Sequence, residues 1–354
     1  MHQWTSLLLT TTLAVLPLSA CGDSGSAPPA QPGAGGQPSG RLATVLSRGK
    51  LVCGVSGELP GFSFVGADGK YSGLDVEVCR AIAAALFDNP DAVEFRNLNA
   101  KERFTAVQTG EVDILSRNTT YTLSRDTSVG LDFAPIVFFD GQGIMVKKSS
   151  GIKTLADLKG KSICIQTGTT TEQNLTDQMR KRGIAYTPVV FEDVNTTFAT
   201  YAEGRCDGVT ADRSQLISRR TTLPNPADNV ILEEVLSKEP LAPAVAGGDS
   251  AWADTVRWTI YALMEAEELG LTQKTVTEQS GSTDPTIKRF LGTEGDLGKG
   301  MGLTNDFALR AIKHVGNYGE IYDRNLGPQT ALNLPRGQNN LWTKGGLLFS
   351  PPFR

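Results

Sequence analysis

The sequence predicts an α/β protein of two lobes, each a mostly parallel sheet flanked by helices. Strand and helix patterns alternate from residue 50 onward, two turn-rich breaks interrupt them, and 354 residues suffice for two domains. Hydrophobic residues make up 40% and charged residues 20% of the chain, as in ordinary globular proteins. The net charge of -4 argues against nucleic acid as the main partner.

The individual elements are predicted from the spacing of apolar residues. The run 51–55 (LVCGV) predicts a buried strand, and 74–86 (LDVEVCRAIAAAL) predicts a helix. Further strands are predicted at 112–115, 143–146, 162–165, 186–191 and 208–211, and helices at 155–158, after Thr169 and at 196–203. Because helices separate the strands, we expect parallel sheets with helices on both faces.

The two breaks set the predicted domain organisation. Residues 139–143 (FDGQG) and 237–242 (SKEPLA) are rich in turn-forming residues. We expect residues 43–139 and 242–354 to form the first lobe and residues 140–241 to form the second. Two chain crossings between the lobes suit a hinge.

The N-terminus predicts export. Residues 1–20 contain an apolar run too short to span a bilayer, as in a signal peptide. The run ends in Leu18-Ser19-Ala20-Cys21, which resembles the lipobox of bacterial lipoproteins. That resemblance implies a lipid on Cys21 and an exported protein anchored to the cell membrane, facing periplasm or exterior; the alternative is ordinary cleavage. Residues 21–42, rich in Gly, Pro and Ser, predict a flexible linker.

Four further cysteines suggest two disulfides, with three possible pairings. Cys53 and Cys79 fall in a strand and the helix after it, while Cys164 falls in a strand and Cys206 just before another. The pairs Cys53–Cys79 and Cys164–Cys206 would each link one lobe; buried free thiols are the alternative. The chain has no CxxC and only two histidines, so we expect neither a metal nor a cofactor.

Candidate binding residues follow the predicted strands. In open α/β sheets, ligands bind beyond the carboxyl ends of strands, where loops converge. Three segments meet that condition: 118–125 (NTTYTLSR), 166–172 (QTGTTTE) and 210–212 (TAD).

These segments and several others resemble a known family. The motifs are 53–55 (CGV), 73–80 (GLDVEVCR), 100–113 (AKERFTAVQTGEVD), 117–126 (RNTTYTLSRD), 139–143, 166–172, 204–208 (GRCDG), 237–241 (SKEPL) and the region from 316 to 345. Residues 43–354 resemble the amino-acid-binding proteins of ABC importers (solute-binding protein family 3), and among them the general L-amino-acid-binding subgroup.

The resemblance implies a type II periplasmic-binding-protein fold with a two-stranded hinge. It further implies a receptor, not an enzyme, which captures free L-amino acids over a broad range, polar and acidic ones included. The receptor closes about its hinge and delivers the ligand to ABC permease subunits, and we expect it to be a monomer.

Physical chemistry makes the implied roles intelligible. A free amino acid is a zwitterion, and removing it from water requires a partner for each charge. Arg125 presents a planar fork that can hold a carboxylate, as the family's arginine at this position does. Asp212 corresponds to the carboxylate that accepts the ammonium. The alternatives are a surface ion pair for Arg125 and a helix cap for Asp212.

Other residues complete the predicted site. Thr169 and Glu172 match a capping box, so the helix start offers free N–H groups to an anion. Thr170 would add a hydroxyl from the second lobe, and Asn118 and Thr120 polar contacts from the first. Arg117 either reaches an acidic ligand side chain or only ties down its own loop.

The resemblance also predicts low selectivity. Ala100 and Leu59 or Pro60 stand where many relatives carry aromatic walls. Phe62 and Tyr121 are either replacement walls or core.

Two other function classes are the alternatives. Some relatives of this fold act as dehydratases, but the chain has no GxSxG or HExxH, Gly160-Lys-Ser162 predicts a turn, and we expect His314 on an exterior helix. A ligand-sensing module would have to act through a partner. The residues from Pro285 on exceed a minimal two-lobed receptor and either wrap the first lobe or contact the permease.

Overall fold

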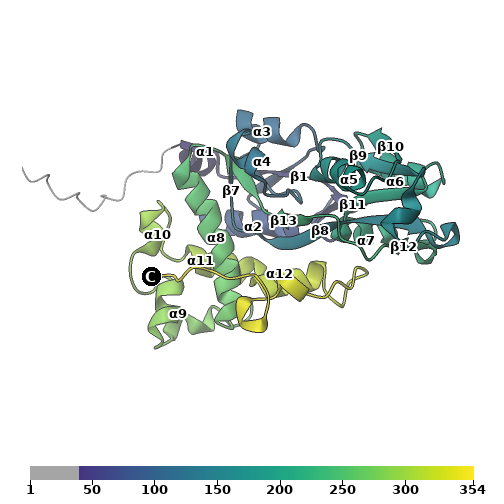
Figure 1. The fold of residues 1–354 in the computed structure, drawn as a ribbon. Helices are drawn as coiled ribbons and strands as arrows, with labels where there is room; N and C mark the ends of the chain where they lie inside the picture. Colours follow the sequence, from purple (N-terminus) through teal and green to yellow (C-terminus); the bar gives the residue numbers. More distant parts are fainter. Residues whose placement is uncertain (1–39) are drawn as a thin grey trace, which may run out of the picture. The chain divides into compact units, whose positions relative to one another are not determined.

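The computed structural model describes residues 40–354 (Figure 1). The predicted signal peptide, the lipidation site Cys21 and the linker up to residue 39 lie outside the described residues. Residues 40–42, predicted as linker, instead begin helix α1 (Gly40–Arg48), which is a correction. Leu42 and Val45 face the same side of α1 and are buried in the core, and that burial favours a helix over a tether.

The first sheet contains five strands in the order β5-β1-β6-β14-β7. They are β5 (Val93–Asn97), β1 (Leu51–Val55), β6 (Ile114–Leu115), β14 (Ala244–Ala246) and β7 (Leu131–Phe133). β1 pairs in parallel with β5 and β6, whereas β14 runs antiparallel to both of its neighbours. We call this sheet and the helices packed on it the first lobe; the helices include α2 (Leu74–Phe87), α3 (Arg103–Thr109), α4 (Leu123–Thr127) and α8 (Ser250–Glu268).

The second sheet follows the path β10-β9-β11-β8-β12. Its strands are β10 (Thr187–Phe191), β9 (Ser162–Gln166), β11 (Gly208–Asp212), β8 (Phe138–Lys147) and β12 (Asn229–Ile231). β10, β9 and β11 are parallel, and β8 is antiparallel to its neighbours. With α5 (Thr170–Lys181), α6 (Val194–Ala202) and α7 (Arg213–Thr221) it forms the second lobe, and 155–158 is a single 3-10 turn, Leu155–Leu158. The two-lobed α/β class is confirmed; the residue boundaries of the lobes stay a prediction.

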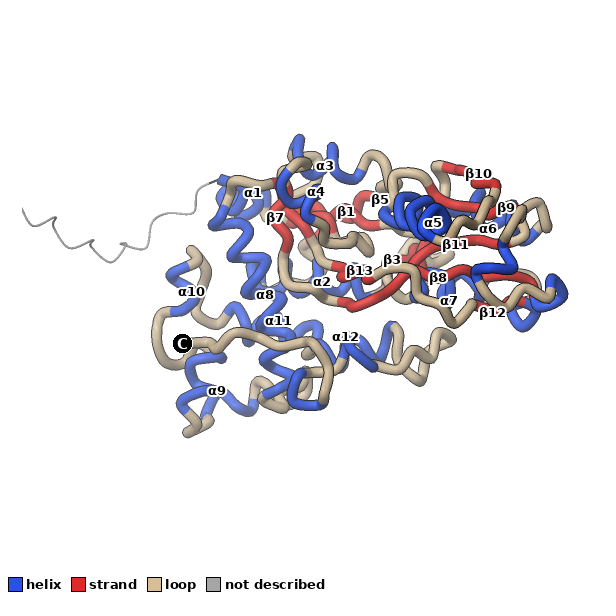
Figure 2. The backbone as a smooth tube through the Cα atoms, viewed as in Figure 1, coloured by secondary structure: helices blue, strands red, loops and turns tan. Residues whose placement is uncertain are grey.

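The two predicted breaks are strands, not turns. β8 continues through residues 139–143, and β13 (Lys238–Leu241) occupies the second break; both are drawn as strands in Figure 2. β13 pairs antiparallel with β8. The turn prediction was wrong because the glycines serve close approach: a Cβ on Gly141 would lie 2.5 Å from Val235 Cγ1 and 2.9 Å from the Ser237 carbonyl oxygen. The two-stranded hinge implied by the resemblance is present.

Three short strands complete the first lobe. β2 (Glu58–Leu59), β3 (Ser63–Val65) and β4 (Tyr71–Ser72) form an antiparallel sheet. In the part of the chain described, no helix is both long and apolar enough to cross a membrane.

The C-terminal residues pack on the first lobe. They form α9 (Pro285–Phe290), α10 (Leu297–Gly300), α11 (Phe307–Val315) and α12 (Tyr318–Asn325), and Figure 1 shows α11 and α12 beside α8. Ile312 of α11 and Tyr322 of α12 lie in the same buried cluster as Ile82 of α2 and Ile260 of α8. Of the two alternatives for this segment, wrapping the first lobe is therefore what is observed.

Both expected disulfides are present. Cys53–Cys79 joins β1 to α2, and Cys164–Cys206 joins β9 to the loop before β11. The alternative of buried free thiols is wrong. The linked residues are 26 and 42 positions apart, and closing such loops in the unfolded chain stabilises the fold by about 3–4 kcal/mol each on the chain-entropy account.

Candidate ligand-binding site

A cavity lies between the two lobes, at the carboxyl ends of strands from both sheets. Its wall includes Arg117, Asn118 and Thr120 from the first lobe and Thr169, Thr170 and Asp212 from the second. Six of the seven residues predicted to bind ligand thus meet in one place. The seventh, Arg125, is buried next to Thr120 and outside the wall.

The loop after β6 is held by buried polar groups. Asn118 adopts a left-handed backbone conformation, and its N–H donates to Asp75 Oδ2 at 3.0 Å. Arg117 Nε donates to the Leu98 carbonyl oxygen at 2.7 Å, so part of its guanidinium does tie down the loop. Burial raises the pKa of the Asp75 carboxyl to about 7 and lowers that of Arg117 to about 10, in spite of the opposite charges of these two residues.

Thr169 caps the start of α5 as expected, but the predicted capping box is not completed, because the Glu172 side chain accepts from Gly168 and not from the Thr169 N–H. Thr169 is the N-cap, and its Oγ1 accepts from the Glu172 N–H at 3.2 Å. Glu172 Oε2 accepts from the Gly168 N–H at 3.1 Å and from Thr167 Oγ1 at 3.0 Å. Across the cavity, Thr170 Oγ1 lies 3.4 Å from Thr120 Oγ1, so the hydroxyls of the two lobes meet in this closed arrangement.

Asp212 occupies the last position of β11 and is 5% exposed. It stands before α7, but its side chain makes no capping hydrogen bond there, so the capping alternative is wrong. Within residues 40–354 no hydrogen bond to its carboxyl oxygens is found, although Asp212 lines the cavity. Burial raises the pKa of this carboxyl well above its usual range, and Asp140 and Glu239 raise it further.

Arg125 is 7% exposed, so the alternative of a surface ion pair is wrong. Its Nη1 donates to the Thr120 carbonyl oxygen at 2.8 Å, and its guanidinium lies 5.1 Å from the centre of the Phe104 ring. Burial lowers the pKa of Arg125, while the charges of Glu239 and Asp212 oppose that shift. A buried guanidinium near the cavity is suited to hold an anion.

Glu239 belongs to the family motif 237–241, but it is not among the residues predicted to bind the ligand. It lies on β13 of the hinge and is 1% exposed. Its carboxylate accepts from Thr120 Oγ1 at 2.6 Å, Thr170 Oγ1 at 2.8 Å and Asn174 Nδ2 at 2.7 Å. Because Thr120 belongs to the first lobe and the other two donors to α5, this one side chain joins hinge and lobes.

Asp140 on the other hinge strand was also missed. It is half-buried, and it accepts from the Gly141 N–H at 2.8 Å and from the Ser214 N–H at 3.2 Å. Burial raises the pKa of Asp140 to about 6, against the lowering effect of these hydrogen bonds. The hinge strands therefore bring two carboxyl groups, those of Asp140 and Glu239, to the site that the sequence did not predict there.

Neither expected aromatic replacement lines the cavity. Phe62 is a core residue packed edge-to-face on Phe138 at 5.2 Å, and Tyr121 stacks on Phe133 at 4.3 Å near the surface. Leu59 does line the cavity. The apolar part of the described wall is thus aliphatic.

The features weighed for other functions lie elsewhere. His314 sits on α11, as expected, with Nε2 2.8 Å from Asp88 Oδ1 and outside the cavity wall. Among residues 40–354, no group of three or more His, Cys, Asp or Glu side chains is arranged to hold a metal ion.

Comparisons with known proteins point to one family. Residues 51–278 match the family described as bacterial extracellular solute-binding proteins, family 3. The chain is 50% identical over 315 residues to the general L-amino acid-binding periplasmic protein AapJ of Rhizobium johnstonii, covering 88% of this chain and 92% of that protein. It is also 50% identical over 322 residues to the glutamate/glutamine/aspartate/asparagine-binding protein BztA of Rhodobacter capsulatus, covering 91% and 95%.

A solved structure is similar as well. The ABC transporter/periplasmic binding protein from Brucella ovis with glutathione bound has a TM-score of 0.87 and 50% sequence identity, covering 90% of this chain and all of that one. The names of the family and of these relatives are those of binding proteins of transport systems, not of enzymes.

Proposed function

This chain belongs to the bacterial extracellular solute-binding proteins, family 3, and we propose that it captures free L-amino acids, polar and acidic ones included, for an ABC importer. The observation that carries the proposal is the interlobe cavity, where Asp212 is buried without a hydrogen-bond partner in the described chain and Arg125 is buried close by. The names of AapJ and BztA, which specify amino acids, support the ligand class.

In the proposed complex each end of the zwitterion has its own partner. Arg125 holds the α-carboxylate. The backbone N–H groups of the first turn of α5, which Thr169 caps and Thr170 begins, donate to the same carboxylate. Asp212 accepts the ammonium. Asn118, Thr120 and Arg117 supply polar contacts from the first lobe.

Closure follows from the division of these groups between lobes. A ligand shifts an equilibrium toward the state that it binds more tightly. Because Arg125 comes from the first lobe and Asp212 from the second, only the closed form satisfies both ends of the ligand. The paired strands β8 and β13 provide the hinge about which the lobes move.

Export is expected of a member of an extracellular family. In addition, we propose that the chain is a monomer held at the membrane by a lipid on Cys21. The Cys21→Ser variant should then move from the membrane fraction to the soluble fraction. Retention of that variant in the membrane fraction would contradict the anchor but not the receptor.

A ligand screen tests the proposed function. Purified protein is heated with each standard amino acid, and a ligand that binds only the folded state must raise the melting temperature. Arg125→Ala should then weaken the best ligand by about 3 kcal/mol or more in calorimetry, because a buried carboxylate loses its partner. If no amino acid raises the melting temperature, or if Arg125→Ala binds within about twofold of wild type, the proposal fails.

A further inference from the structure

Arg103 is a buried cation that the proposed function leaves unused. It is the first residue of α3 and shares a buried face with Ala106 and Val107. The residue is 3% exposed, yet its side chain forms part of the cavity wall. Its guanidinium lies 4.8 Å from the centre of the Phe104 ring, which fixes its direction.

Its hydrogen bonds are incomplete. A guanidinium carries five N–H donors. In the described chain, only Nη1 of Arg103 has a partner, Thr119 Oγ1 at 3.5 Å, which is the outer limit of a hydrogen bond, and the buried Nε has none. A buried donor without an acceptor destabilises the fold, so donors of this kind in a cavity wall point to an absent acceptor.

Its charge is the least compensated of the three arginines. Arg117 lies near Asp75 and Glu58, and Arg125 lies near Glu239 and Asp212. Arg103 has Asp212 as its nearby anion and two like charges, Arg117 and Arg125. Burial, followed by these two like charges, lowers the pKa of Arg103 well below its usual range.

In the proposed complex, Arg125 and the N–H groups at the start of α5 hold the α-carboxylate of a simple zwitterion, and Asp212 accepts its ammonium. Arg103 then has no ligand group of its own. A second carboxylate on the ligand would supply the acceptor that Arg103 lacks. Building on the proposed function, we infer that Arg103 binds the side-chain carboxylate of a dicarboxylic amino acid and thereby favours glutamate and aspartate over glutamine and asparagine.

A pair of matched ligands distinguishes binding of the side-chain carboxylate by Arg103 from binding of the α-carboxylate and from a purely structural role. Glutamate and glutamine differ by a carboxylate and an amide of nearly equal shape, so calorimetric affinities for both are measured with wild type, Arg103→Gln and Arg103→Lys. Wild type should prefer glutamate by about tenfold or more, and Arg103→Gln should weaken glutamate by about a hundredfold while changing glutamine by less than about fivefold. Arg103→Lys, which keeps the charge but loses the fork, should fall between them.

The control is Arg336→Gln, which removes another partly buried guanidinium, paired with Glu267 and not part of the cavity wall. It should lower the melting temperature and leave the ratio of glutamate to glutamine affinity unchanged. Equal losses for both ligands in Arg103→Gln would overturn the inference, because they would place Arg103 on the α-carboxylate or in folding. An unchanged ratio and affinity would overturn it too. If wild type binds neither ligand nor any other amino acid, the proposed function itself has failed.

Discussion

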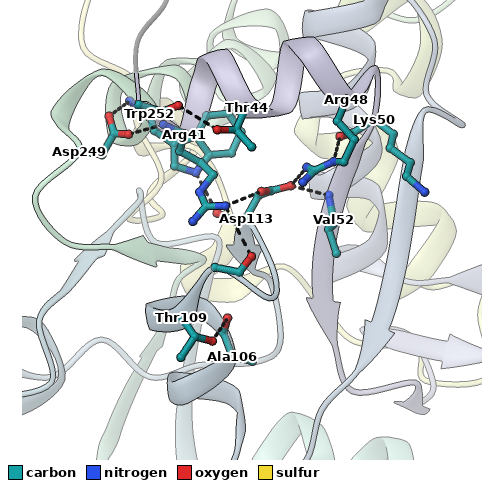
Figure 3. Close-up of polar contacts among 12 residues, drawn as sticks. Arg41, Thr44, Arg48, Lys50, Val52, Ala106, Thr109, Asp113, Asp249 and Trp252 are labelled. Carbon is teal, nitrogen blue, oxygen red and sulfur yellow. Dashed lines mark hydrogen bonds and ion pairs between the residues drawn. The ribbon is translucent and has the colours of Figure 1, made fainter.

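Two buried ionic clusters, one in the first lobe and one in the cavity between the lobes, differ in how completely they are paired. In the first, the fully buried Asp113 carboxylate accepts from Arg41, from Arg48 and from the Val52 N–H at 2.7 Å (Figure 3). Trp252 Nε1 donates to the Asp113 carbonyl oxygen at 2.8 Å, so α8 joins the same cluster. In the cavity, by contrast, Arg103 Nε and the Asp212 carboxyl have no hydrogen-bond partner within the described residues.

The contrast separates stabilising charges from binding charges. Pairing and hydrogen bonds offset the desolvation cost of a buried charge, and removing its partner destabilises the fold. A buried charge left open costs free energy in the empty protein and recovers it only when a ligand arrives. The Asp113 cluster therefore fastens α1 to the lobe, and the cavity is prepared for a charged ligand.

The largest effect expected from this contrast is on ligand affinity. Asp212→Asn should weaken amino-acid binding by about 3–5 kcal/mol, because the ammonium would be buried without its counter-charge. The unliganded variant should be as stable as wild type or more so, since a poorly solvated carboxyl is removed. Calorimetry and thermal unfolding measure the two effects, and a large loss of unliganded stability would break the contrast.

Asp113→Asn should do the opposite. The free energy of unfolding should fall by about 2–3 kcal/mol, because two arginines and a buried N–H lose a common acceptor. Affinity for the best amino acid should stay within about twofold of wild type. Urea titration gives the stability. The control is Glu94→Gln, which removes the partly exposed partner of Lys50 and Arg96 and should cost less than about 0.5 kcal/mol.

Glu239 tests whether a fully paired charge can also serve binding. Glu239→Gln should weaken ligand affinity by about 1–2 kcal/mol, because the charge-assisted hydrogen bonds from Thr120, Thr170 and Asn174 hold the lobes together. Lys238→Gln changes the exposed neighbour on the same strand and should have no measurable effect. Equal affinities of Glu239→Gln and wild type would assign Glu239 to the hinge fold alone.

Elements of the fold could be predicted from the sequence where their pattern depends on neighbouring residues. The strands β1 and β9 and the helices α2 and α5 were predicted because apolar spacing and caps are properties of neighbouring residues. The hinge was misread as two turns because Gly141 and its neighbours carry turn signals, whereas strand pairing between β8 and β13 depends on residues about 100 positions apart.

The site shows the same limit. Asp212 and Arg125 were named from motifs, but Glu239, Asp140 and Arg103 draw their importance from partners far away in the chain. Only Arg103 had a readable signal, since a charged residue three and four positions before Ala106 and Val107 falls on the buried face of a helix. Its incomplete hydrogen bonding could be recognised only in three dimensions.

The smallest expected effect is a change in bound protons. Burial, with Asp140 and Glu239, keeps the pKa of Asp212 well above its usual range, so the empty receptor retains a proton there at mildly acidic pH. A ligand ammonium favours the ionised carboxylate and lowers that pKa, so binding should release up to one proton and affinity should rise with pH until the pKa of the empty receptor is passed.

Calorimetry at one mildly acidic pH in phosphate and in imidazole buffers measures this release, because the two buffers take up a proton with different enthalpies. The difference between buffers should vanish in Asp212→Asn. It should persist in Asp140→Asn, although that neighbour titrates with a pKa of about 6, because burial and not Asp140 is the main cause of the Asp212 shift. Equal binding enthalpies in both buffers for wild type would mean that Asp212 is already ionised in the empty receptor. Its charge would then be stabilised without a ligand, as the charge of Asp113 is, and the contrast between the two clusters would fail.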